Sequence, residues 1–107
     1  MLVIRDAQMD ALRDEAVEAN LRALADELAP EAGDIDRREL LVRVASEAKA
    51  ASRRGYVLKD DVRRFVRCAL RLGWGFVEAQ AWARAIDRDA GLAPEAKLEL
   101  FEARSPG

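Results

Sequence analysis

The stretch KDDVRRFVRCALRL, residues 59–72, decides the fold of this chain. Its apolar side chains recur at spacings of three and four residues, which is the period of one face of an α-helix. Asp60 and Asp61 fall in the first turn, where the positive end of the helix dipole favours acidic side chains. The stretch therefore predicts an amphipathic helix whose buried face is made of Val62, Phe65, Val66, Ala69, Leu70 and Leu72.

A second helix is predicted just before this stretch. Asp34 or Asp36 is expected to cap its start, since a carboxylate can accept hydrogen bonds from the free N–H groups of a first turn. The helix should run to Arg54, and Gly55 fits a left-handed C-terminal cap. The apolar positions of this helix are Leu40, Leu41, Val44, Ala48 and Ala51.

The N-terminal part of the chain predicts a first helix from about Ala7 to Ala29. Asp6 is its expected N-cap, and Pro30 ends it because the residue before a proline is pushed out of helical geometry. Residues 1–5 are expected to form an arm that packs on the body. One apolar face follows from the spacing of Met9, Leu12, Ala16, Val17, Leu21, Leu24 and Leu28.

Two more helices are predicted towards the C-terminus. The first runs from about Phe76 to Asp89, with Gly91 as its expected C-terminal cap. A short one follows from Pro94, which suits a first turn, to near Arg104. Residues 105–107 should be a loose tail. With no strand-like alternation, the whole sequence 1–107 predicts one all-α domain, a compact bundle of four main helices plus a short C-terminal helix.

The composition argues against several classes of function. The chain has no histidine, and so lacks the commonest general base and metal ligand. Cys68 is the single cysteine, and its position predicts a small side chain at the core edge rather than a nucleophile. We therefore expect no enzyme activity, no cofactor and no bound metal. No signal peptide or membrane-spanning run is evident, so a soluble, cytoplasmic protein is expected.

Charge is unevenly distributed along the chain. Residues 1–36 hold three basic and ten acidic side chains, whereas residues 37–71 hold eleven basic and four acidic ones. Residues 72–107 are close to balance, and the whole chain has a net charge of −2. One interpretation is that the first helix and the middle of the chain attract each other. The other is that a basic face meets an acidic partner.

A row of arginines in residues 59–72 is the clearest basic feature. Arg63, Arg67 and Arg71 lie four residues apart and so share one helix face, with Arg64 beside them. Such a row can contact phosphates, which makes nucleic-acid binding one hypothesis. The acidic net charge of the chain favours pairing with carboxylates instead, either on the first helix or on a protein partner.

Aromatic side chains mark a second candidate surface. Trp74, Phe76 and Trp82 lie within nine residues, and Tyr56 lies in the connector after Gly55. Tryptophan, tyrosine and arginine are enriched at the energetic centres of protein interfaces. Phe76 and Trp82 also suit a core that has few large side chains, whereas Trp74, between two glycines, is expected to be partly exposed. The candidate partner-binding residues are thus Tyr56, Arg63, Arg67, Arg71, Trp74, Phe76 and Trp82.

Several groups of residues between 4 and 86 carry a resemblance to a known family. They are IRDAQMDAL (4–12), RGY (54–56), Asp61-Val62 with Phe65, LGWGF (72–76) and Trp82. In these the chain resembles small helical proteins encoded beside the effector and spike genes of bacterial type VI secretion systems. The resemblance implies an accessory role, with a secreted effector or toxin as the protein partner.

The sequence thus favours a non-enzymatic protein-binding accessory, an adaptor or chaperone for a type VI secretion effector. An immunity protein that binds and inhibits a toxic effector is the alternative, and a small nucleic-acid-binding protein is the second alternative. A homodimer is compatible with each of these. None of them involves a membrane.

Overall fold

The computed structural model describes residues 17–105, and this part of the chain is helical with no strand. A helix occupies residues 17–28 and leads into a 3-10 turn, η1 (Ala29–Glu31). The remaining elements are α2 (Arg37–Arg53), α3 (Lys59–Leu72), α4 (Phe76–Ala79), α5 (Ala81–Asp87) and α6 (Pro94–Arg104). The all-α prediction is confirmed. The predicted arm 1–5, the predicted helix start at Ala7 and the last two residues of the tail lie outside the described residues.

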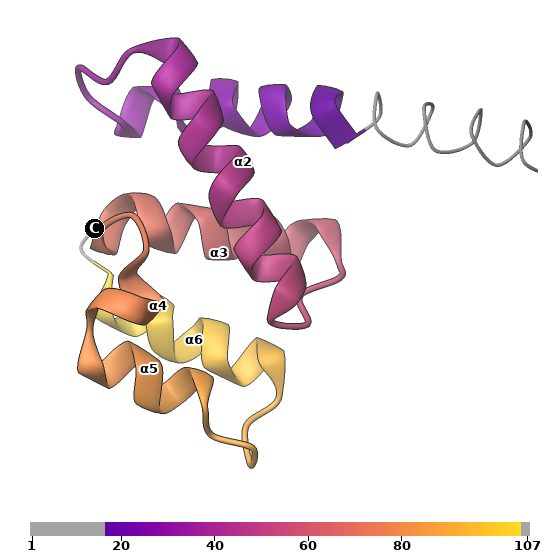
Figure 1. Ribbon diagram of the computed structural model, residues 1–107, viewed down its shortest axis with the longest axis vertical. Coiled ribbons are helices and arrows are strands. Elements are labelled where there is room, and N and C mark those ends of the chain that lie inside the picture. Colours follow the sequence, from indigo (N-terminus) through magenta and orange to yellow (C-terminus); the bar gives the residue numbers. More distant parts are fainter. Residues whose placement is uncertain (1–16, 106–107) are drawn as a thin grey trace, which may run out of the picture.

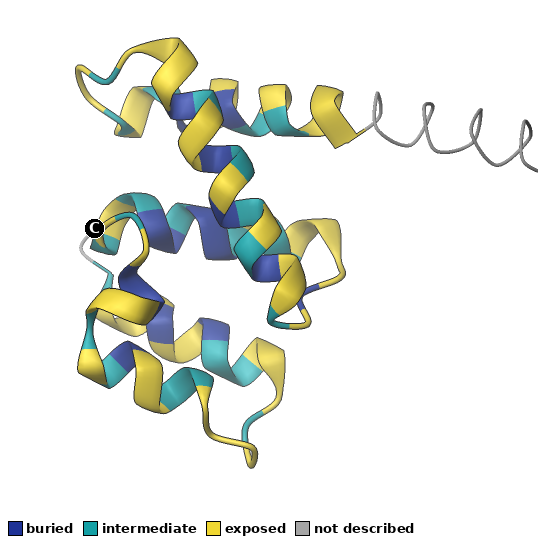
Figure 2. Ribbon diagram, viewed as in Figure 1, coloured by how far each residue is buried: buried dark blue, intermediate teal, exposed yellow. Residues whose placement is uncertain are grey.

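The helix α3 lies at the centre of this arrangement. It packs against α2 on one side and against α6 on the other. In Figure 1, α2 crosses α3 and leads up to the helix of residues 17–28, while α4, α5 and α6 lie on the far side of α3. Figure 2 shows buried residues on the parts of α2, α3 and α6 that face one another.

The C-terminal half encloses a core that we call the aromatic cluster, made of Tyr56, Phe65, Phe76 and Phe101. Each of these side chains is at most 1% exposed. The ring of Phe65 lies 5.4 Å from Tyr56, 5.5 Å from Phe76 and 6.4 Å from Phe101, measured between centroids. Aromatic pairs at such distances contribute beyond the area they bury. Phe65 therefore joins α3 to three other segments.

The N-terminal half encloses a smaller core that we call the aliphatic cluster. It consists of Ala25, Leu28, Leu40, Val44 and Val66. Val66 comes from α3, directly after Phe65, so adjacent residues of one helix supply the two clusters. Partly buried Trp74 packs against both. This double role of α3 explains why residues 59–72 decide the fold.

The prediction of one helix from Phe76 to Asp89 is wrong. Gln80 has an extended backbone (φ −114°, ψ 127°) and separates α4 from α5, which ends at Asp87. Its side-chain amide donates to the Leu72 carbonyl at 3.0 Å and accepts from the Trp82 indole N–H at 2.6 Å. These bonds fix Gln80 to the neighbouring turn, and tertiary contacts override the local helical pattern.

Of the two predicted glycine caps, the one at Gly55 agrees with the structure and the one at Gly91 does not. Gly55 has φ 95° after α2, in agreement with the left-handed cap. Gly91 is not among the glycines with positive φ, so its predicted cap is wrong. Its N–H instead donates to the Asp89 carboxylate at 2.9 Å, in a turn after α5. Asp36 is the N-cap residue of α2, although its side chain makes no capping hydrogen bond.

Candidate protein-binding surface

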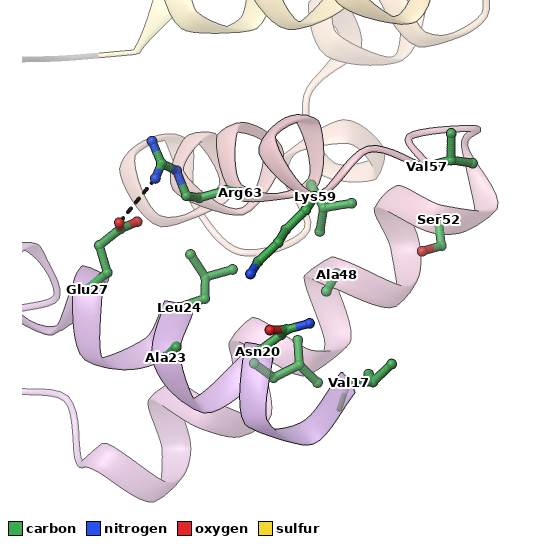
Figure 3. Close-up of a pocket in the computed structure, with 12 residues that line it drawn as sticks. Val17, Asn20, Ala23, Leu24, Glu27, Ala48, Ser52, Val57, Lys59 and Arg63 are labelled. Atoms are coloured by element: carbon green, nitrogen blue, oxygen red, sulfur yellow. Dashed lines mark hydrogen bonds and ion pairs between the residues drawn. The ribbon is translucent and has the colours of Figure 1, made fainter. Parts of the chain in front are cut away.

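A groove runs between the helix of residues 17–28, α2 and the start of α3, with a volume of about 430 Å³ (Figure 3). Its lining is mainly apolar. Val57, in the α2–α3 connector, is 85% exposed, and Val17 at the end of the described chain is 48% exposed. The groove is lined by Val17, Asn20, Leu21, Ala23, Leu24, Glu27, Ala48, Ser52, Val57, Lys59, Val62 and Arg63.

Small side chains on facing helices leave this space open. Ala48 and Ser52 are one turn apart on α2 and line the groove together, and Ala23 lines it from the helix of residues 17–28. Close-packed interiors normally fill such a gap with interdigitating side chains. Here Leu21 and Leu24 remain only partly buried, so apolar surface faces the gap.

Two basic side chains line the groove, both from the first half of α3. Lys59 reaches from the start of α3 into the space towards Asn20 (Figure 3). Arg63, one turn later, contacts Glu27, whereas Lys59 forms no ion pair within residues 17–105. We call Lys59 and Arg63 the basic rim.

The arginine row of α3, in contrast, is paired within the chain. Arg63 and Arg67 each contact Glu27, at 3.3 and 3.4 Å, and Arg71 contacts Glu31 at 2.8 Å. Arg67 also approaches Glu31 at 3.9 Å. The acidic and basic segments of the sequence thus meet across an internal interface. The three candidate arginines are engaged there and do not form an open basic face.

Two of the four candidate aromatic residues lie inside the protein. Tyr56 and Phe76 are each 1% exposed, in the aromatic cluster. This burial corrects their assignment to a partner-binding surface. Burial also raises the pKa of Tyr56 to about 12, so the phenol stays protonated.

Trp74 and Trp82 are half-buried and separate from the groove. Trp82 packs against Phe101, with ring centroids 6.2 Å apart, and the Arg104 guanidinium lies 4.8 Å from its ring centre. Trp74 fills the junction between the two clusters. The structure therefore gives each tryptophan a packing role, and neither lines the groove.

Two ionisable side chains, Cys68 and Glu47, are buried. The thiol of Cys68 is 2% exposed, and burial raises its pKa to about 11, which leaves it a poor nucleophile. Glu47, 8% exposed, accepts a hydrogen bond from the Gly75 N–H at 2.6 Å, and burial raises its pKa above 4.5. This hydrogen bond connects the turn before α4 to α2. The sequence signal for Glu47 was an acid at the edge of the face carrying Val44 and Ala51.

The described residues offer neither a metal site nor a membrane-spanning helix. Residues 17–105 contain no group of three acidic or cysteine side chains placed to hold a metal ion. None of their helices is long and apolar enough to cross a membrane. No family model, curated protein or solved structure matches this chain. The groove and its basic rim are therefore the features on which a function can be argued.

Proposed function

We propose that this protein is a non-enzymatic protein-binding accessory that holds its partner in the groove between residues 17–28, α2 and α3. The observation that carries the proposal is an apolar groove with exposed valines at its edge and the basic rim on its α3 side. Apolar surface surrounded by polar groups is typical of protein-interaction sites. Leu58, next to Val57, is 64% exposed and extends the apolar edge.

The partner we propose is a secreted effector, with the protein acting in the cytoplasm as its adaptor or chaperone. The resemblance to proteins encoded beside type VI secretion genes supports this choice of partner. A groove suits such a role because it can hold a helix or linker of the effector and leave the toxic domain free.

The test is co-expression of the tagged full chain with the product of each neighbouring gene, followed by purification. A matched pair of variants locates the contact: Val57→Asp changes the groove, whereas Val42→Asp changes a valine of α2, 66% exposed, that does not line it. The proposal expects capture of an effector that is lost with Val57→Asp and kept with Val42→Asp. Capture that is insensitive to Val57→Asp would contradict the groove as the site.

An activity assay on the captured effector separates the roles. An adaptor or chaperone leaves the effector active, whereas an immunity protein abolishes its activity. An inhibited effector would therefore replace the adaptor proposal by the immunity alternative. Nucleic-acid binding is not proposed, because the arginines it would use contact Glu27 and Glu31.

A further inference from the structure

We infer that the groove accepts an amphipathic helix of its partner, about three turns long, with a carboxylate opposite Lys59. The inference rests on the proposed function, because it takes the groove as the partner-binding site and names the kind of segment that fits there. Three observations support it: the helical walls of the groove, its length, and the charge of its lining.

The walls of the groove favour a partner segment that is itself a helix. Apart from Val57, every lining residue belongs to a helix. Beyond its first turn, a helix uses its backbone groups in its own hydrogen bonds. Residues 17–105 contain no strand, so an extended segment would find no sheet edge to pair with. On these apolar walls it would bury N–H and C=O groups without partners, whereas a helix satisfies its own.

The length of the groove sets the number of apolar contacts. The lining follows the helix of residues 17–28 from Val17 to Glu27, which is about 15 Å at about 1.5 Å per residue. Apolar side chains at positions i, i+4 and i+7 of a partner helix span about 10 Å. Three such side chains therefore fit along the groove, against partly buried apolar residues such as Leu24 and Val62.

The charge of the lining favours an acidic partner. Glu27 is the single acidic residue among the described lining residues, and Arg63 and Arg67 both contact it, at 3.3 and 3.4 Å. Lys59, in contrast, forms no ion pair within residues 17–105. In Figure 3 its side chain extends into the groove, between the Arg63–Glu27 pair at one end and Val57 at the other. A carboxylate on the partner helix at this point would be complementary.

The experiment measures the binding of labelled model peptides to the full chain by fluorescence anisotropy. The main probe, the glutamate helix, is a cross-linked helical peptide of about 14 residues with leucines at i, i+4 and i+7 and a glutamate on the flank. Three matched peptides replace the glutamate by lysine, reorder the residues so that no apolar face remains, or break the helix with a proline. We expect the glutamate helix to bind at least about fivefold more tightly than each of these.

Charge reversal on the protein gives the sharpest comparison. Lys59 is the first residue of α3, where a glutamate suits the helix dipole, so Lys59→Glu should keep the fold. It should weaken binding of the glutamate helix about tenfold and strengthen binding of the lysine helix. Lys49→Glu makes the same change at an exposed lysine that does not line the groove, and should change neither more than about twofold at physiological salt.

Three results would overturn the inference. They are no binding of the glutamate helix to the unmodified chain, equal binding of all four peptides, or the same loss with Lys49→Glu as with Lys59→Glu. Sedimentation of the chain alone adds a fourth. A dimer that Val57→Asp converts to a monomer would mean that a second copy occupies the groove. Circular dichroism on each variant checks that the helices remain.

The inference and the proposed function fail separately. If Val57→Asp abolishes capture of an effector but the glutamate helix does not bind, the proposed function stands and the helical partner is refuted. If the glutamate helix binds with the expected dependence on Lys59 but no effector is captured, the helix site stands and the choice of an effector as partner is refuted.

Discussion

The aromatic cluster and the aliphatic cluster stabilise the two halves of this protein in different ways. The C-terminal half buries four aromatic rings in mutual contact. The helix of residues 17–28 instead contributes Ala25 and Leu28 to a core of aliphatic side chains, and ion pairs at the surface add to its attachment. Since surface ion pairs contribute little, the first half is the less securely held. The open groove lies in that half.

Phe65→Ala tests the stronger half and should have the largest effect. It removes a ring that contacts Tyr56, Phe76 and Phe101, and we expect a loss of about 3–5 kcal/mol in the free energy of unfolding. Denaturant unfolding followed by circular dichroism measures the loss. Leu100→Ala, at a side chain 42% exposed on α6, is the control and should change stability by under about 0.5 kcal/mol.

Leu28→Ala tests the weaker half. Leu28 is fully buried, but the groove nearby gives its neighbours room to relax, so we expect a smaller loss of about 2–3 kcal/mol. Hydrogen exchange should show faster opening of residues 17–28 and little change in α6. A loss equal to that of Phe65→Ala, with α6 opening as well, would mean that the two clusters unfold as one unit.

The ion pair between Arg71 and Glu31 should contribute less than either core residue. A double-mutant cycle with Arg71→Met and Glu31→Gln isolates their coupling, for which we expect about 0.2–1 kcal/mol, falling as salt is added. The pair Arg43–Glu39, within α2, is the control. A coupling several times larger would show that the ion pairs, rather than the aliphatic cluster, hold the first helix.

Glu102 and Glu47 should have the smallest effects on stability. These effects should depend on pH, with opposite signs. The hydrogen-bonded Arg64 guanidinium lowers the pKa of Glu102, so its contribution is present above pH 4.5 and is lost as pH falls through the folded-state pKa. Burial raises the pKa of Glu47, so its contribution is present below pH 4.5 and is lost as pH rises through the folded-state pKa.

Thermal melts across the acid range check both signs. Glu102→Gln should flatten the loss of stability below pH 4.5, whereas Glu47→Gln should slightly raise the melting temperature at neutral pH. The amide oxygen of the substituted side chain can still accept the hydrogen bond from the Gly75 N–H. A fall in melting temperature at neutral pH for Glu47→Gln would show that the charge on Glu47 is favourable.

The parts of the fold that follow from local pattern were predicted well. The helices 59–72 and 94–104 were expected with these bounds, because their apolar spacing and first-turn residues agree. The break in the helix at Gln80 was not predicted, because it depends on hydrogen bonds to Leu72 and Trp82 that form only in the folded chain. The groove was missed for a similar reason. It arises where Ala23, Ala48 and Ser52 meet, and no periodicity in one segment reveals which small side chains will face each other.

The most direct test of the account is hydrogen exchange on the full chain with and without its captured effector. If the groove is the binding surface, new protection should appear in residues 17–28 and in the connector around Val57, and the helices α5 and α6 should exchange as before. Protection confined to Trp74, Trp82 and α6, with the groove unchanged, would contradict the account and assign binding to the aromatic half instead.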